Sequence, residues 1–167
     1  MNNFIDVSHL KQSDRPSSIL RFRVGAFITD DSEATNHIVL FVELNGNRSV
    51  RIQIKQQGIG RDAELVFMSK PYTHSQNMLV IAQAEPTSPN VTVQSIMDTI
   101  EEMKRYRYRF AKGRKGCRWW TYTVMKDFQG KGLIKQRSAE DVLDAVGLEW
   151  AESGMKGPTT IVKGQFY

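Results

Sequence analysis

Two β-rich runs joined by a short turn constrain the fold of this chain most strongly. Residues 37–44 are almost all apolar, residues 45–47 read Asn-Gly-Asn, and residues 49–55 alternate between apolar and polar side chains. Asn-Gly is a strong hairpin signal, and alternation with a period of two is typical of a half-buried strand. The sequence therefore predicts a β-hairpin with one face in the core.

The length of the turn decides which side chains share a face of this hairpin. With a three-residue turn, Leu40 would lie beside Ile52 on one face, and His37 would share the other face with Arg51 and Gln53. A two-residue turn would shift the register by one residue and move Gln53 away from His37. The sequence leaves both turn lengths open; with three residues, Val39 and Phe41 would also lie on the face of His37.

Further strands and helices follow the same reasoning along the chain. Strand patterns cover residues 19–27, 63–68 and 78–82, with a short extended piece at 106–110 and an edge strand at 160–162. Amphipathic helices begin at Thr92 and Ser138, and the second should extend to Trp150. This order predicts an α+β fold, with a mainly antiparallel sheet of four to six strands and two or three helices packed on one side.

Length and composition limit the organisation of the chain. Its 167 residues indicate one α+β domain over 18–167, preceded by a flexible polar arm at 1–17. No apolar run approaches the length of a membrane span, and the N-terminus lacks the features of a signal peptide. One cysteine excludes an internal disulfide. We therefore expect a cytoplasmic protein without a membrane partner, and no motif indicates a metal or another cofactor.

The segment 116–128 carries the only cysteine of the chain. Cys117, Trp120, Val124 and Phe128 fall at helical spacing, so Cys117 should lie in the first turn of a buried helix. The free N–H groups of a helix start stabilise a thiolate, and Arg114, Lys115 and Arg118 would act in the same direction. Cys117 is thus a candidate nucleophile with a lowered pKa, and the alternative is a small buried apolar residue. We expect Arg118 to be exposed.

A nucleophilic thiol needs a base, and histidine is the usual one. His9 and His74 fall in an arm and a loop, whereas His37 opens a buried-looking strand. His37 is therefore the candidate base, Gln53 the candidate residue that orients it, and Arg51 a weaker candidate. The alternative is a satisfied polar residue at a strand end.

The order of these features resembles known folds. A strand led by His37, a hairpin and a later helix that starts at Cys117 resemble the permuted NlpC/P60 papain-like fold of lecithin:retinol acyltransferase-type proteins. That resemblance implies that Cys117 and His37 meet between helix and sheet. Residues 19–150 are also similar to an uncharacterised fungal family with a His-led strand, a Ser-Val-Arg strand and a Gly-Cys-Arg-x-Trp helix, a resemblance that implies no specific activity.

Cationic and aromatic side chains alternate over the segment 104–120. Its cations are Lys104, Arg105, Arg107, Arg109, Lys112, Arg114, Lys115 and Arg118, and its rings are Tyr106, Tyr108, Phe110, Trp119 and Trp120. Cations with stacking rings are typical of single-strand nucleic-acid binders. The alternatives are a solvated basic loop whose rings pack inward, or a loop that holds an anionic substrate near the thiol.

Three functions fit the sequence. The first is a small enzyme in which Cys117 and His37 act on an amide, ester or thioester. The second is a non-covalent cyclase or isomerase (Diels-Alder type) of fungal specialised-metabolite biosynthesis, which needs shape and hydrogen-bond donors. The third is a nucleic-acid-binding module. The expected partner is a small-molecule substrate, and the oligomeric state stays open. The candidate substrate-binding residues are Arg51, Arg114, Arg118, Trp119, Trp120 and Tyr122.

Overall fold

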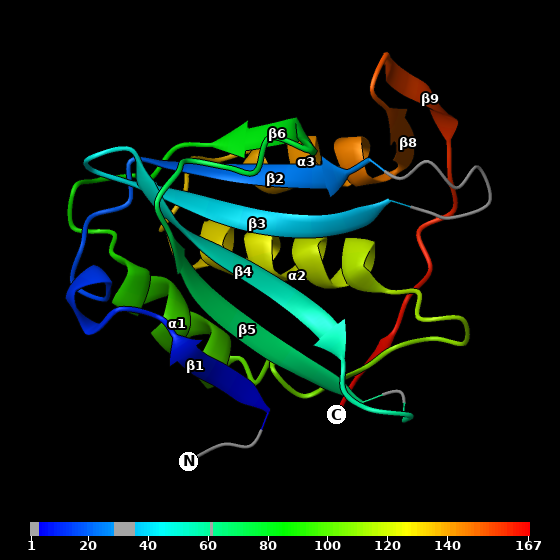
Figure 1. Ribbon diagram of the computed structural model, residues 1–167, viewed down its shortest axis with the longest axis horizontal. Coiled ribbons are helices and arrows are strands. Elements are labelled where there is room, and N and C mark those ends of the chain that lie inside the picture. The colour runs from blue at the N-terminus through cyan, green and yellow to red at the C-terminus, as the bar shows by residue number, and fades with distance from the viewer. Residues whose placement is uncertain (1–3, 29–35, 61) are drawn as a thin grey trace.

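A six-stranded sheet forms the centre of the molecule (Figure 1). The computed structural model describes residues 4–28, 36–60 and 62–167. The strand order is β1-β5-β4-β3-β2-β6; β1 runs parallel to β5, and all other neighbours are antiparallel. The strands are β1 (Ile5–His9), β2 (Arg21–Phe27), β3 (His37–Leu44), β4 (Arg48–Gln56), β5 (Ala63–Lys70) and β6 (Met78–Ala84).

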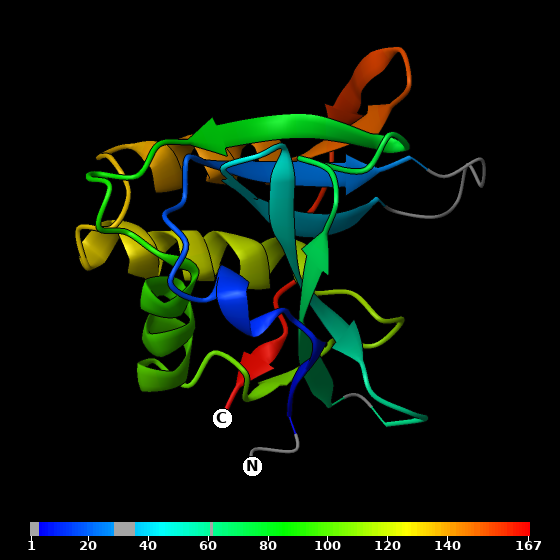
Figure 2. The same cartoon turned by 60° about the vertical axis from the view of Figure 1, so that its left-hand side comes forward.

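Three α-helices pack on one face of this sheet (Figures 1 and 2). They are α1 (Val93–Glu102), α2 (Cys117–Gly130) and α3 (Ser138–Val146). Two small antiparallel pairs complete the chain: β7 (Tyr108–Arg109) with β10 (Gln165–Phe166), and β8 (Leu148–Ala151) with β9 (Gly154–Pro158). The predicted α+β class is confirmed, with a sheet that is mixed because β1 is parallel to its neighbour.

The β3–β4 hairpin has a three-residue turn, one of the two lengths that the sequence leaves open. Leu44 pairs with Arg48 across the turn, and Gly46 and Asn47 adopt positive φ angles of 81° and 56°. These are the residue types that accept a left-handed backbone at least cost. Leu40 pairs with Ile52 in the resulting register. This register puts Leu40 and Ile52 on the face that packs in the main core, and it puts Val39 and Phe41 on the other face with Arg51.

The main core lies between the sheet and the helices. Trp120, Val124 and Phe128 of α2 are each at most 1% exposed, and the rings of Phe128 and Phe22 lie 5.9 Å apart. Helix α1 begins at Thr92, which forms a reciprocal capping box with Ser95. These elements hold α2 against the sheet along its length, which positions Cys117 at the end of the sheet where β3 starts.

The opposite face of the sheet carries a smaller apolar cluster. Val39, Phe41 and Met78 are buried there, with Phe27 and Val80 packed beside them. Strand alternation places His37 on this same outer face, since Val39 and Phe41 follow it at intervals of two residues. The outer face is therefore partly apolar and partly lined by polar side chains.

Three local expectations differ from the structure. Residues 1–17 were expected to form a flexible arm, but Ile5–His9 pairs with β5, and buried Asp14 binds Arg48 and Ser69. The last helix ends at Val146 rather than reaching Trp150, which lies in β8. Residues 160–162 are not a strand; the final strand is β10. These differences depend on long-range pairing, which periodicity does not reveal.

Candidate functional site

A glycine and a buried tyrosine build the start of helix α2. Gly116 precedes the helix with a φ of 141°, and no side chain caps the helix start. A Cβ at this position would lie 2.7 Å from the Tyr108 hydroxyl oxygen. That hydroxyl donates to the Gly116 carbonyl at 2.8 Å and accepts from the Gly164 N–H at 2.9 Å. Tyr108 thus ties the helix start to the C-terminal segment, and only glycine fits beside it.

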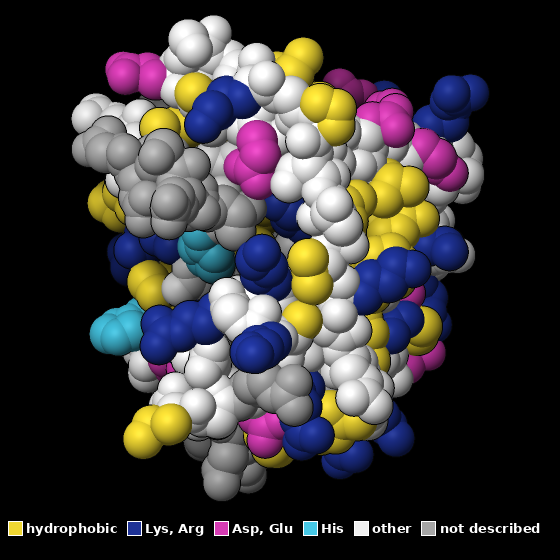
Figure 3. All heavy atoms as spheres, turned by 90° about the vertical axis from the view of Figure 1, so that its right-hand side faces the viewer, with side chains coloured by type: hydrophobic (Ala, Val, Ile, Leu, Met, Phe, Trp, Pro, Cys, Tyr) yellow, Lys and Arg dark blue, Asp and Glu magenta, His cyan; other side chains and the backbone are white. Residues whose placement is uncertain are grey.

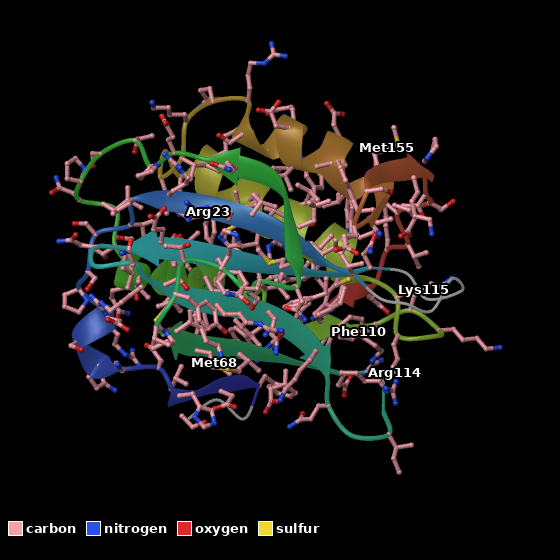
Figure 4. All side chains as sticks on the ribbon, turned by 45° about the horizontal axis from the view of Figure 1, so that its top comes forward. Arg23, Met68, Phe110, Arg114, Lys115 and Met155 are labelled. Carbon is pink, nitrogen blue, oxygen red and sulfur yellow. The ribbon has the colours of Figure 1, made fainter. Side chains whose placement is uncertain are left out.

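A pocket of about 240 Å³ opens at this helix start. Arg114 and Lys115, labelled in Figure 4, reach it from the preceding loop, and Figure 3 shows several Lys and Arg side chains at this end of the molecule, with a few acidic side chains among them. The remaining lining residues come from the helix start and the C-terminal segment: Gly116, Cys117, Arg118, Thr159, Thr160 and Val162. Among the described residues, no carboxylate lines the pocket. It therefore combines cations, hydroxyl groups and the positive end of a helix.

The thiol of Cys117 lies at the inner side of this pocket and is buried. Burial raises its pKa, although the Arg118 guanidinium and the backbone N–H groups of Ile38 and Arg118 act in the opposite direction. The expectation that the helix start and the cations would lower this pKa is wrong. The thiol stays protonated at neutral pH, because desolvation outweighs the nearby positive charges.

Arg118 is structural, and the prediction that it would be exposed is wrong. Its side chain is 6% exposed and forms an ion pair with Glu149 at 3.1 Å. It also donates to the carbonyl groups of Val146 and Leu148, each at 2.7 Å. The Val146 carbonyl lies at the end of α3, where backbone acceptors lack partners within the helix, and Leu148 is the first residue of β8. Arg118 therefore joins α2 to the end of α3, and its charge is already engaged there.

The candidate base His37 does not meet the thiol. The His37 ring stacks on Phe27 with ring centres 6.3 Å apart, and it forms a hydrogen bond with Gln53. Ile38 points into the core with Cys117, so alternation turns His37 to the outer face. Cys117 and His37 share no hydrogen bond. The structure brings His37, Gln53 and Arg51 together with one another and leaves them on the far side of the sheet from the thiol.

The three aromatic candidates of α2 have different positions. Trp120 is 1% exposed in the core and donates to the Arg105 carbonyl at 2.8 Å, so it cannot contact a ligand. Trp119 and Tyr122, with rings 5.5 Å apart, line a separate cavity of about 470 Å³ along α2. That cavity is larger than the Cys117 pocket, but it holds the Arg105–Asp127 ion pair and lacks the free helix start. We therefore base the functional argument on the Cys117 pocket.

The rings of segment 104–120 mostly pack inward. Tyr108, Phe110 and Trp120 are buried, and the Lys163 ammonium lies 4.3 Å from the centre of the Trp119 ring. A nucleic-acid binder needs exposed rings on which bases can stack. The cations of this segment are thus not accompanied by a row of exposed aromatic rings on which bases could stack.

Sequence reasoning missed the wall of the pocket that residues 159–162 supply. The sequence predicts an edge strand at 160–162, and no motif connects this segment with Cys117. The link arises from the Gly164–Tyr108 hydrogen bond and from the pairing of β10 with β7, both of which are long-range. A sequence pattern of short range could not have found it.

No group of three or more His, Cys, Asp and Glu side chains within the described residues could hold a metal ion. None of the described helices has the length and apolar character that crossing a membrane requires.

Comparison with known proteins identifies a sequence family. A family described as a domain of unknown function (DUF7770) matches residues 23–167, which is most of the chain. The chain belongs to this family. No curated protein and no solved structure matches it. The DUF7770 match agrees with the expectation of an uncharacterised family, while the fungal origin and the likeness to the NlpC/P60 fold stay predictions.

Proposed function

We propose that this chain binds a small anionic organic molecule, such as a carboxylate, in the pocket at the start of α2. One observation carries the proposal: the pocket joins the start of α2, which has no side-chain cap at Gly116, to Arg114 and Lys115, and no carboxylate is among the described residues that line it. A helix start carries roughly half a positive charge, which favours an anion, and at this one the N–H groups of Cys117 and Arg118 already act on the thiol.

The size and chemistry of the pocket narrow the ligand class. About 240 Å³ is below the range of roughly 300–1,000 Å³ that drug-sized ligands occupy, so the ligand is a small metabolite. Thr159 and Thr160 add hydroxyl groups, and Val162 adds an apolar contact. Charge-assisted hydrogen bonds to Arg114 would fix the anionic group, and the apolar wall would hold a short carbon skeleton.

The proposal retains the anionic small molecule and leaves out the covalent step. A thiol nucleophile needs a thiolate or a neighbouring base. Burial keeps Cys117 protonated, and His37 is hydrogen-bonded to Gln53 on the other face of the sheet. If the ligand reacts in this pocket, the arrangement suits a non-covalent cyclase or isomerase, in which the protein positions and desolvates the reactant.

The test is a thermal-stability screen with a panel of small carboxylates and their neutral amides. A ligand that binds the folded state raises the melting temperature in proportion to the logarithm of its concentration. The double variant Arg114→Gln/Lys115→Gln should abolish the shift, whereas Lys112→Gln, which removes an exposed charge of the same loop outside the pocket, should retain it.

Two results would contradict the proposal. The first is an equal shift with the carboxylates and with their amides. The second is a shift that survives in the Arg114→Gln/Lys115→Gln variant. A covalent mass increase on Cys117, absent in Cys117→Ser, would instead restore the thiol enzyme.

A further inference from the structure

Four side chains on the outer face of the sheet form a cluster that the Cys117 pocket does not involve. The Arg51 guanidinium lies over the Phe27 ring, 4.7 Å from its centre, and donates to the Gln53 side-chain oxygen at 2.5 Å. Gln53 also forms a hydrogen bond with His37, whose ring stacks on Phe27. The cluster thus spans β2, β3 and β4, and its members hold one another in place.

The cluster has more hydrogen-bond donors than acceptors. A guanidinium carries five N–H donors, and the only acceptor bound to Arg51 in the described structure is one neutral amide oxygen. The Nε atom of Arg51 is buried and has no partner among the described residues. A half-buried charge without a counterion is costly, so the cluster lacks an acceptor.

Three other arginines that are shielded from solvent pair with carboxylates, whereas Arg15, like Arg51, binds a glutamine oxygen and has a buried Nε without a partner among the described residues. Arg23 pairs with Glu43 at 2.7 Å, Arg105 with Asp127 at 2.6 Å and Arg118 with Glu149 at 3.1 Å. On the outer face, Glu43 is taken by Arg23 and Glu64 by Lys55 at 2.9 Å. Within the described residues, Arg51 therefore has no carboxylate partner. The nearby carboxylates, Glu43 of β3 and Glu64 of β5, already pair with other cations.

We propose that Arg51, with Gln53 and His37, forms a second ligand site, which binds the carboxylate or phosphate group of a small molecule on the outer face of the sheet. The guanidinium is held in place by Phe27 and Gln53, so little side-chain entropy is lost when an oxyanion binds. Burial lowers the pKa of His37, so its ring is neutral above pH 6.5 and Arg51 supplies the positive charge. This site is independent of the function proposed for the Cys117 pocket.

The test is an NMR titration of the whole chain with sodium phosphate and, separately, with sodium acetate, at constant ionic strength and pH 7.5. The Nε–H signal of Arg51 and the ring signals of His37 report this site, and the amides of Cys117 and Arg118 report the other pocket. We expect saturable shifts at Arg51 and His37, with a Kd below about 10 mM for at least one of the two anions. The anion that saturates identifies the group that the site accepts.

Two substitutions and a control make this test decisive. Gln53→Glu places a carboxylate beside Arg51, so it should abolish anion binding while leaving the melting temperature unchanged or higher. Arg51→Gln should also abolish binding. Lys70→Gln removes one positive charge from the neighbouring strand β5, two residues from the Met68 position that pairs with Arg51, and should bind as the original chain does.

The proposal is overturned by any of three results. One is the absence of saturation at Arg51 and His37 with both anions up to about 50 mM, well above the expected Kd. Another is undiminished binding in Arg51→Gln or in Gln53→Glu. The third is an equal loss of binding in Lys70→Gln, which would indicate a general effect of net charge.

Discussion

The Cys117 thiol faces the backbone N–H of Ile38, yet Cys117 shares no hydrogen bond with His37, which directly precedes Ile38 in the chain. The reason is the two-residue period of a strand, which sends neighbouring side chains to opposite faces. Ile38 packs in the main core with Cys117, while His37 stacks on Phe27 outside it. The two members of the candidate dyad therefore lie in different places: Cys117 in the pocket at the start of α2, and His37 in the polar cluster on the outer face of the sheet.

Cys117 should react slowly in the folded protein. Burial raises the pKa of its thiol, so alkylation by iodoacetamide should show a midpoint above the ordinary value of about 8.5. The unfolded chain should react fully at the same pH. The measurement is the rate of alkylation by mass spectrometry across a pH series, with and without urea. A midpoint clearly below about 8 in the folded state would show an activated thiol instead.

Arg118→Met should destabilise the fold strongly. Arg118 is 6% exposed on its side chain, and its loss removes the ion pair with Glu149 and the donor to the carbonyls of Val146 and Leu148. Breaking a buried ion pair in this way costs about 3–5 kcal/mol. Urea unfolding measures the change in free energy. The control Arg114→Gln alters an exposed side chain and should change stability by less than about 0.5 kcal/mol; a similar cost for both variants would contradict the structural role of Arg118.

Tyr108→Phe should loosen the Cys117 pocket. The variant retains the buried ring but loses the hydroxyl that joins Gly116 to Gly164. Leaving such buried backbone groups without a partner costs about 1–3 kcal/mol. We expect lower stability and weaker binding of the pocket's ligand, measured by urea unfolding and by ligand titration. Tyr122→Phe is the matched control, because Tyr122 is half-buried and lies outside this pocket. An unchanged ligand affinity in Tyr108→Phe would show that the Tyr108 hydroxyl is not needed for ligand binding in the pocket.

Stability should fall in mild acid because of His37. Burial lowers the pKa of this ring below 6.5; the hydrogen bond with Gln53 opposes the shift, and Arg51 adds to it. The unfolded chain therefore binds the proton more readily, and the contribution to stability present above pH 6.5 is lost as the pH falls through the folded-state pKa. His37→Gln should flatten this part of the pH profile of unfolding. Burial also lowers the pKa of His74, so this residue adds its own pH dependence to the stability. The effect of His37→Gln should therefore be measured in a chain that also carries His74→Gln.

Local sequence patterns predicted much of the fold and part of the site. The turn at 45–47 set the β3–β4 register, and this register placed Arg51, Gln53 and His37 on one face. The helix at Cys117 also starts where the spacing predicts. The patterns could not show on which face of the sheet the side chain of His37 lies relative to the distant helix α2. They also could not show whether burial or nearby charge decides the pKa of the Cys117 thiol.

The missed parts have a common physical cause. Contacts between segments far apart in the chain form three of these features. They are strand β1, the wall of the pocket at residues 159–162, and the ion pair of Arg118 with Glu149. Arg118 illustrates this: its neighbours in sequence are cations and aromatic residues, while its partner Glu149 lies 31 positions later. Propensity and periodicity are local properties and carry no information about such pairs.

The most direct test of the account is an amide NMR titration of the chain with benzoate and, in parallel, with its neutral counterpart benzamide. If the start of α2 is an anion-binding pocket, the amides of Cys117, Arg118 and Trp119 should shift and saturate with benzoate and stay unchanged with benzamide. The Arg114→Gln/Lys115→Gln variant should weaken the benzoate response at least about tenfold, because charge-assisted hydrogen bonds of about 1.5–3 kcal/mol each are lost. Equal responses to benzoate and benzamide, or no response to either at the start of α2, would contradict the central claim.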